Sequence, residues 1–129
     1  MGMDMFVYTE SPVEDSSVLV HLREWTETGG TWVCKSKNWQ VVVNGSQTLE
    51  AADAGPERDE VLRIRPRVRF QTEINIEGRL STEAMTVATC SAQKVAFRLH
   101  GLIFDPQLEA LIVPLSEGPF ARIPAPAAA

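Results

Sequence analysis

The sequence has few cysteines and no long hydrophobic run, and each absence excludes a class of protein. Cys34 and Cys90 stand far apart and form no Cys-x-x-Cys pair. Neither a disulfide scaffold nor a redox motif is therefore indicated, and we expect two buried free thiols. The apolar runs, among them those at 41–43, 102–104 and 111–113, are all much shorter than a membrane span. We therefore expect no association with a membrane.

Motifs for metal, cofactor or catalytic chemistry are also lacking. The glycines at 28–31 and 116–119 do not have the spacing of a phosphate-binding loop. His21 and His100 lie in segments separate from each other and from both cysteines, whereas structural zinc sites take their ligands in close pairs. No spaced pair of carboxylates indicates acid–base catalysis. We expect no metal, no cofactor and no enzymatic activity.

The first residues of the chain indicate where in the cell the protein is expected, and its net charge indicates which class of partner is disfavoured. The first ten residues contain two acids and no Lys or Arg, unlike a signal peptide, so we expect a cytoplasmic protein, or a virion protein if the chain is viral. The 129 residues fit one domain, and 44% hydrophobic with 22% charged residues is typical of a globular protein. The net charge of −5 argues against a general nucleic-acid coat.

The most regular pattern runs from residue 61 to residue 76. Apolar residues hold one parity, while arginines, other polar residues and the first valine hold the other. A period of two predicts a strand with one buried face and one basic face. A fully extended strand of this length would exceed the diameter of the domain, so we expect a break at Pro66. The apolar set is Leu62, Ile64, Val68, Phe70, Ile74 and Ile76.

Short apolar segments separated by turn residues continue through the chain. The glycines at 29 and 30 predict a hairpin turn, and Asn44 with Gly45 predicts another turn. Residues 46–54 fit either the second arm of a hairpin or one or two helical turns capped by Thr48. The other expected strands cover residues 17–26, 31–37, 38–43, 84–90, 94–104 and 108–115.

These segments together predict an all-β fold. We expect an antiparallel β-sandwich of the jelly-roll kind or a small barrel, with at most one or two short helical turns. An extended N-terminal arm (1–16) and a Pro/Ala-rich C-terminal arm (116–129) would flank a β domain at 17–115. Because extended arms often exchange between subunits, we expect a homo-oligomer.

The candidate interaction residues are four arginines and the apolar residues of the two arms. Guanidinium groups along one strand face can bind carboxylates or phosphates, or can be solvated and paired with neighbouring acids, so three interpretations are open. The four arginines are Arg63, Arg65, Arg67 and Arg69. The apolar candidates are Met3, Met5, Phe6 and Tyr8 in the N-terminal arm, with Phe120 and Ile123 in the C-terminal arm.

A small acidic β domain with an apolar head at 1–8 and a proline-punctuated tail at 119–129 resembles the small cement, or decoration, proteins of phage capsids. The resemblance covers size and architecture over the whole chain. It implies a homo-oligomer that binds a major capsid protein lattice in the virion and catalyses no reaction. Two alternatives are a nucleic-acid-binding β barrel, and a small regulatory or inhibitor protein that docks on one protein partner.

Overall fold

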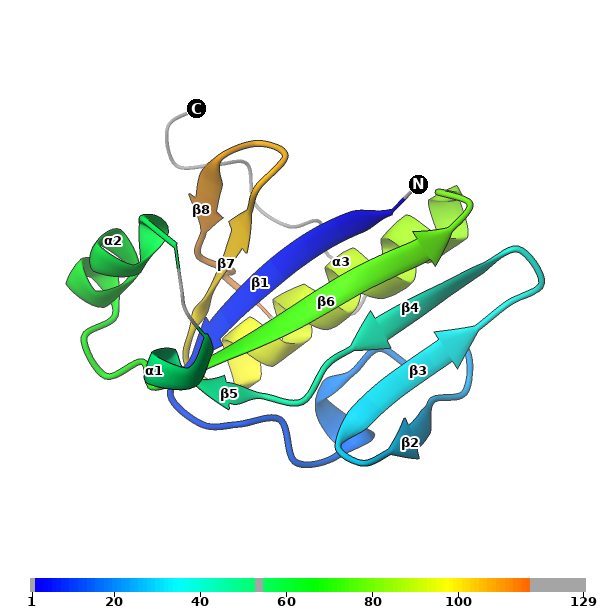
Figure 1. Cartoon of the computed structure of the whole chain (residues 1–129), viewed down its shortest axis with the longest axis horizontal. Helices are drawn as coiled ribbons and strands as arrows, with labels where there is room; N and C mark the ends of the chain where they lie inside the picture. Colours follow the sequence, from blue (N-terminus) through cyan, green and yellow to red (C-terminus); the bar gives the residue numbers. More distant parts are fainter. Residues whose placement is uncertain (1, 53–54, 117–129) are drawn as a thin grey trace.

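The computed structural model describes residues 2–52 and 55–116, which form a mixed α/β fold. A single open antiparallel sheet of eight strands carries a 17-residue helix, α3, on one face (Figure 1). In chain order the elements are β1 (Met3–Thr9), η1 (Ser16–Val18), β2 (Thr26–Thr28), β3 (Thr31–Lys35), β4 (Trp39–Val43), β5 (Gln47–Thr48), α1 (Leu49–Ala52), α2 (Glu57–Ile64), β6 (Phe70–Gly78), α3 (Thr82–Arg98), β7 (Leu102–Asp105) and β8 (Ala110–Ile112).

The N-terminal strand β1 lies inside the sheet. The strand order is β2-β3-β4-β6-β1-β7-β8, and the short β5 also pairs with β6. β1 pairs with β6 over its whole length, from Met3 opposite Ile76 to Thr9 opposite Phe70, and its other edge pairs with β7. The sheet is therefore assembled from segments far apart in sequence, with β2 and β8 as its two edges.

Helix α3 covers one face of the sheet because of the spacing of its small residues. Ser81 caps its N-terminus, with Ser81 Oγ accepting a hydrogen bond of 3.1 Å from the Ala84 N–H group. Alanines recur every four residues and are all buried, so they lie on one helix face and allow close approach to the strands. The repeated alanines are Ala84, Ala88, Ala92 and Ala96. They pack with Val7, Val41, Val43, Ile74 and Ile76 in the larger core cluster.

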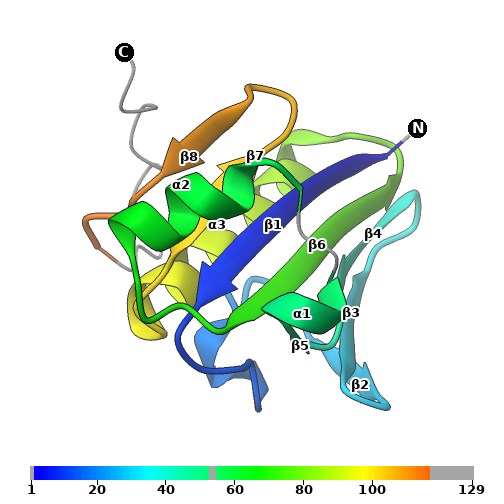
Figure 2. The ribbon, with the colours of Figure 1, turned by 60° about the vertical axis from the view of Figure 1, so that its left-hand side comes forward.

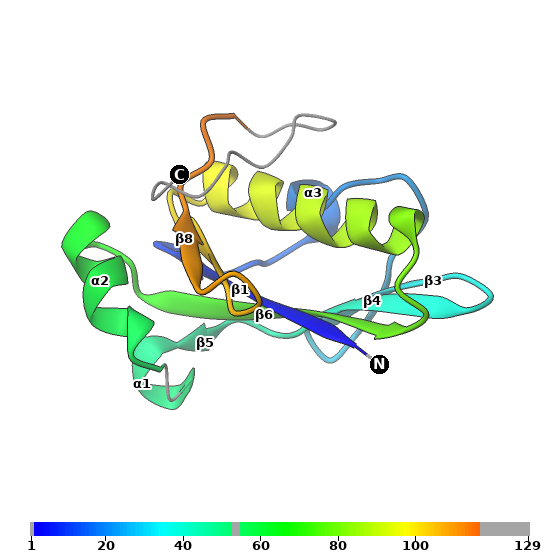
Figure 3. The same cartoon turned by 90° about the horizontal axis from the view of Figure 1, so that it is seen from above.

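A second, smaller core lies on the opposite face, where α2 crosses one end of the sheet (Figure 2). Tyr8 and Leu102 come from the sheet, and they contact Leu49, Val61 and Val68 of the connecting segment and short helices. Along β1, Tyr8 lies on this side while Val7 joins the α3 core, as the alternation of a strand requires. The rest of this face carries no helix (Figure 3).

The predicted all-β sandwich or barrel is wrong, and helix α3 is the main reason. The prediction of strands rests on a weak alternation at 84–90 and on the alternation of Val95, Phe97 and Leu99 with polar residues at 94–104. The repeat of alanines at intervals of four, which is a helical signal, continues through both segments. Together with the Ser81 cap it produces one continuous helix up to Arg98.

The predicted strand over 61–76 is correct only in its second half. Residues up to Ile64 belong to α2, whose first turn carries three acids and whose last turn carries Arg63, as the helix dipole favours. The helix ends there because Arg65, its C-cap, precedes Pro66, and the residue before a proline disfavours the helical conformation. From Thr72 to Ile76 the predicted alternation is confirmed, with positions 72, 74 and 76 buried and positions 73 and 75 partly exposed.

The ends of the chain also differ from the expectation. Residues 3–9 were expected in an extended arm and instead form β1, while the C-terminal arm beyond residue 116 lies outside the described residues.

The strand expected at 17–26 is replaced by the single turn η1 and irregular chain. The hairpin at the glycines 29 and 30 is confirmed, and both adopt positive φ. No helix of the described residues is long and apolar enough to span a membrane.

Two glycine-to-alanine substitutions test the contact between the end of α3 and β1. A Cβ atom on Gly101 would lie 1.8 Å from the Tyr8 carbonyl oxygen, whereas on Gly45 the nearest atom would be 3.5 Å away. We expect Gly101→Ala to lower the free energy of unfolding by about 1–3 kcal/mol or more, because backbone atoms must move apart. The control Gly45→Ala should change it by less than about 1 kcal/mol. Urea denaturation measures both, and equal stability of the two variants would contradict the packing of Gly101 on β1.

Candidate functional site

The candidate site is the part of the sheet that no helix covers, on the side opposite α3 (Figure 3). We call it the open face. Its side chains follow from the strand registers, because the residues that alternate with the buried core positions along each strand point to the other side of the sheet. From β1 across to β2, the open face includes Asp4, Glu73, Asn75, Glu77, Gln40, Val42, Thr31, Val33, Lys35, Thr26 and Thr28.

A row of hydrogen-bonded side chains crosses three strands of the open face. Asn75 of β6 donates from Nδ2 to Asp4 Oδ1 on β1 at 2.6 Å and to Glu73 Oε2 at 3.0 Å. Asn44, at the end of β4, donates from Nδ2 to Asn75 Oδ1 at 2.6 Å. We call these four residues the amide–acid row. Because each side chain is held by its neighbours, the row presents carboxylate oxygens in a fixed arrangement without any ligand.

A buried tyrosine lies on the same side of the sheet, beneath α2. Tyr8 is fully buried, its hydroxyl donates to Glu57 Oε2 at 2.5 Å, and it accepts a hydrogen bond of 2.9 Å from Gln71 Nε2. Burial raises the pKa of the Tyr8 hydroxyl above its ordinary value, and the bond to the Glu57 carboxylate raises it further. This group therefore anchors α2 to the sheet and is a poor proton donor near neutral pH.

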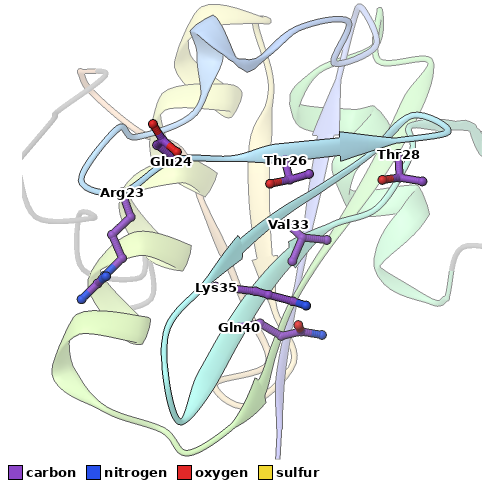
Figure 4. Close-up of a pocket in the computed structure, with 7 residues that line it drawn as sticks. All are labelled: Arg23, Glu24, Thr26, Thr28, Val33, Lys35 and Gln40. Carbon is purple, nitrogen blue, oxygen red and sulfur yellow. The ribbon is translucent and has the colours of Figure 1, made fainter.

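A hollow of about 740 Å³ lies at the other end of the open face, over β2, β3 and β4. Figure 4 shows Thr26, Val33, Lys35 and Gln40 along the strands, with Arg23 extending away from them beside α3. The full lining is Arg23, Glu24, Thr26, Thr28, Val33, Lys35 and Gln40. The hollow therefore contains two cations and one acid, in contrast to the carboxylates of the amide–acid row.

The two cations of the hollow, Arg23 and Lys35, differ in whether their charge is already paired. The Arg23 guanidinium lies 3.1 Å from Glu83 Oε1 of α3 and 5.8 Å from the centre of the Trp39 ring, so it is already engaged. Lys35 is exposed, and no carboxylate of the described residues forms an ion pair with it. The Gln40 amide donates to Glu77 Oε1 at 2.5 Å. Lys35 is therefore the cation of the hollow that a ligand can reach.

The four predicted arginines do not form one surface. Arg63 pairs with Glu60 on α2 itself, and Arg67 is exposed in the following turn. Arg65 borders a hollow next to α3 and β7, whereas Arg69 borders a different hollow near α1. The basic strand face that would have held them side by side is absent, because their segment is a helix end and a turn.

The apolar residues predicted as arm contacts belong instead to the interior of the sheet, as far as the structure describes them. Met5 and Tyr8 are buried, and Met3 and Phe6 are partly buried in β1. The Phe6 and Phe104 rings stack with centroids 6.5 Å apart. Phe120 and Ile123 lie outside the described residues.

The sequence-based reasoning missed the amide–acid row, although a signal for it existed. Gln71, Glu73, Asn75 and Glu77 occupy alternate positions, which puts them on one face of a strand. Asp4 and Asn44 join them only through pairing with distant strands, and no local pattern indicates that pairing.

The cysteines and histidines do not come together as a metal site. Cys34 and Cys90 are free and buried, which confirms that part of the prediction, and burial raises the pKa of both thiols. Within residues 2–52 and 55–116, no group of three or more His, Cys, Asp or Glu side chains is placed to hold a metal ion.

The titration of Tyr8 tests this end of the site, because the chain contains one tyrosine. An unfolded chain releases the tyrosine proton near pH 10, whereas the folded protein retains it to higher pH. Stability should therefore fall as the pH rises above about 10, where the unfolded state binds fewer protons. Tyrosinate absorbance should appear near pH 10 in concentrated urea and only at higher pH in buffer. Glu57→Gln should bring the folded-state pKa down, and identical wild-type midpoints in urea and in buffer would contradict the buried bond.

Comparison with protein-family models, with curated proteins and with solved structures gives no match for this chain.

Proposed function

We propose that this chain is a small, non-catalytic binding protein that docks on one protein partner through the open face of its sheet. The observation that carries the proposal is the amide–acid row, in which side chains of three strands are held in place on a face that no helix covers. Preorganised polar groups lose little side-chain entropy on binding, which favours recognition of a complementary surface.

The charges of the row favour a protein over a nucleic acid. Asp4, Glu73 and Glu77 place three carboxylates on the sheet around Asn75, and a phosphate backbone would be repelled there. The predicted arginines are distributed over separate parts of the molecule and offer no continuous basic track. A partner that presents Lys or Arg side chains to the row is the complementary surface.

The position of β1 favours a partner-binding domain over a capsid cement protein. The cement hypothesis assigns the shell contacts to both arms and to Arg63, Arg65, Arg67 and Arg69, and the C-terminal arm beyond residue 116 lies outside the described residues. In the fold, residues 3–9 fill the middle of the sheet, and Met5, Val7 and Tyr8 are buried there. Met5, Val7 and Tyr8 cannot reach a neighbouring subunit without opening the core, so we assign recognition to the exposed face, to which β1 contributes Asp4.

Photo-crosslinking from matched positions tests the proposal. A photoreactive residue replaces Asp4 on the open face or, as a control, Asp59 on α2, and both positions are exposed. In cells that make the protein, we expect the Asp4 position to give one crosslinked product that contains one partner protein, and the Asp59 position to give none. Adding Asn75→Lys should reduce the Asp4 product by about tenfold, because it places a cation beside Glu73 and removes the Asn75 hydrogen bonds to Glu73 and Asn44.

Several outcomes would contradict the proposal. They are crosslinks to nucleic acid, a ladder of many copies typical of a lattice, or equal products from Asp4 and Asp59. An Asp4 product unaffected by Asn75→Lys would also contradict it, since the row would then play no part in recognition.

A further inference from the structure

Strand β3 is longer than its neighbour β2 at one end, and this leaves part of its edge unpaired. The pairing of β2 with β3 ends at Thr26 opposite Val33. β3 continues through Cys34 and Lys35, which pair only with β4 on its other side. The edge of β3 beside Lys35 is the place where β2 would have continued.

The main-chain groups of Lys35 point toward this unpaired edge. The Ser36 N–H group donates to the Trp39 carbonyl at 2.9 Å, so Ser36 is directed to β4. Successive residues of an antiparallel strand direct their N–H and C=O groups to opposite sides, so those of Lys35 face away from β4. In the part of the chain that the structure describes, no residue preceding β2 forms a main-chain hydrogen bond with them.

Charged side chains of both signs surround this edge. Lys35 and Arg23 line the hollow of about 740 Å³ that lies beside it, with Glu24 as its one acid. Lys37 follows in the turn after β3. The backbone of Arg79 lies beside the same turn, because its N–H group donates a hydrogen bond of 2.8 Å to the Asn38 carbonyl. Because Arg23 is paired with Glu83, Lys35 is the cation of the hollow that has no ion pair among the described residues.

We propose that an extended, acidic segment of the protein partner adds to the edge of β3 at Lys35. Its main chain pairs with the N–H and C=O groups of Lys35, and a Glu or Asp side chain enters the hollow to bind the Lys35 ammonium group. Strand addition of this kind obtains affinity from main-chain hydrogen bonds and specificity from the pocket that receives alternate side chains. The inference rests on the proposed function and adds the conformation and charge of the partner segment.

A peptide titration of the full-length, ¹⁵N-labelled chain tests this inference. The probe is an acetylated peptide of about eight residues that alternates Val and Glu, and its counterpart alternates Val and Lys. At millimolar concentration we expect the Glu peptide to shift the amide resonances of Lys35 and Thr26, and the Lys peptide to leave them unchanged. Lys35→Glu should weaken binding of the Glu peptide by about tenfold or more, because a charge-assisted bond becomes a repulsion.

Lys37→Glu is the matched control, since Lys37 is exposed in the same hairpin but does not line the hollow. It should weaken binding by less than about twofold at about 0.15 M salt. Three outcomes would overturn the inference: no shift at Lys35, equal binding of both peptides, or equal losses in the two variants. Shifts of Lys35 that depend on protein concentration alone would also overturn it, because a second copy of the chain would then occupy the edge.

The result can be separated from that of the crosslinking experiment. If the Glu peptide does not bind but the Asp4 position still crosslinks to one partner, the edge inference fails and the proposed function stands. If the peptide binds but no partner crosslinks to the open face, the edge remains a peptide site while the proposed function fails.

Discussion

The pairing of β1 between β6 and β7 is the interaction on which the rest of the structure depends. It joins the first residues of the chain to strands that begin some 70 and 100 residues later. It also fixes which side chains face α3, because Met5 and Val7 enter the large core while Tyr8 points to the opposite side. A shift of one residue in this register would exchange the two faces of the central strand.

That register also produces two unlike sides of one sheet. On the α3 side, Ala88 and Ile74 are fully buried, as expected where a helix of small residues packs on β-branched strands. On the other side, α2 closes over Tyr8 at one end and leaves the rest uncovered. Antiparallel sheets commonly expose one face to water. Here the exposed face carries a bonded carboxylate and amide row beside a basic hollow, a distribution of charge suited to recognising another protein.

Much of the local structure could be predicted from the sequence, and most of the long-range structure could not. The turn at the glycines 29 and 30, strand β4 and the short helix after Thr48 follow from local preferences. Around residue 64 the alternating pattern was misleading, since Val61 and Ile64 also fit one helix face before Pro66. The site could be predicted only along β6. Nothing near Asp4 or Asn44 in the sequence indicates that β1 and β4 flank that strand and bring both residues to Asn75.

The most direct test of the account measures which side chains of the free protein are reached by solvent. A soluble gadolinium chelate broadens the NMR signals of exposed groups and requires no substitution in the chain. The account predicts strong broadening of the side-chain amides of Asn75 and Asn44, and little effect on the methyl groups of Ile74 and Ile76. Protection of the Asn75 and Asn44 amides in the free protein, to the same degree as the two isoleucines, would show that this face of the sheet is covered and would contradict the account.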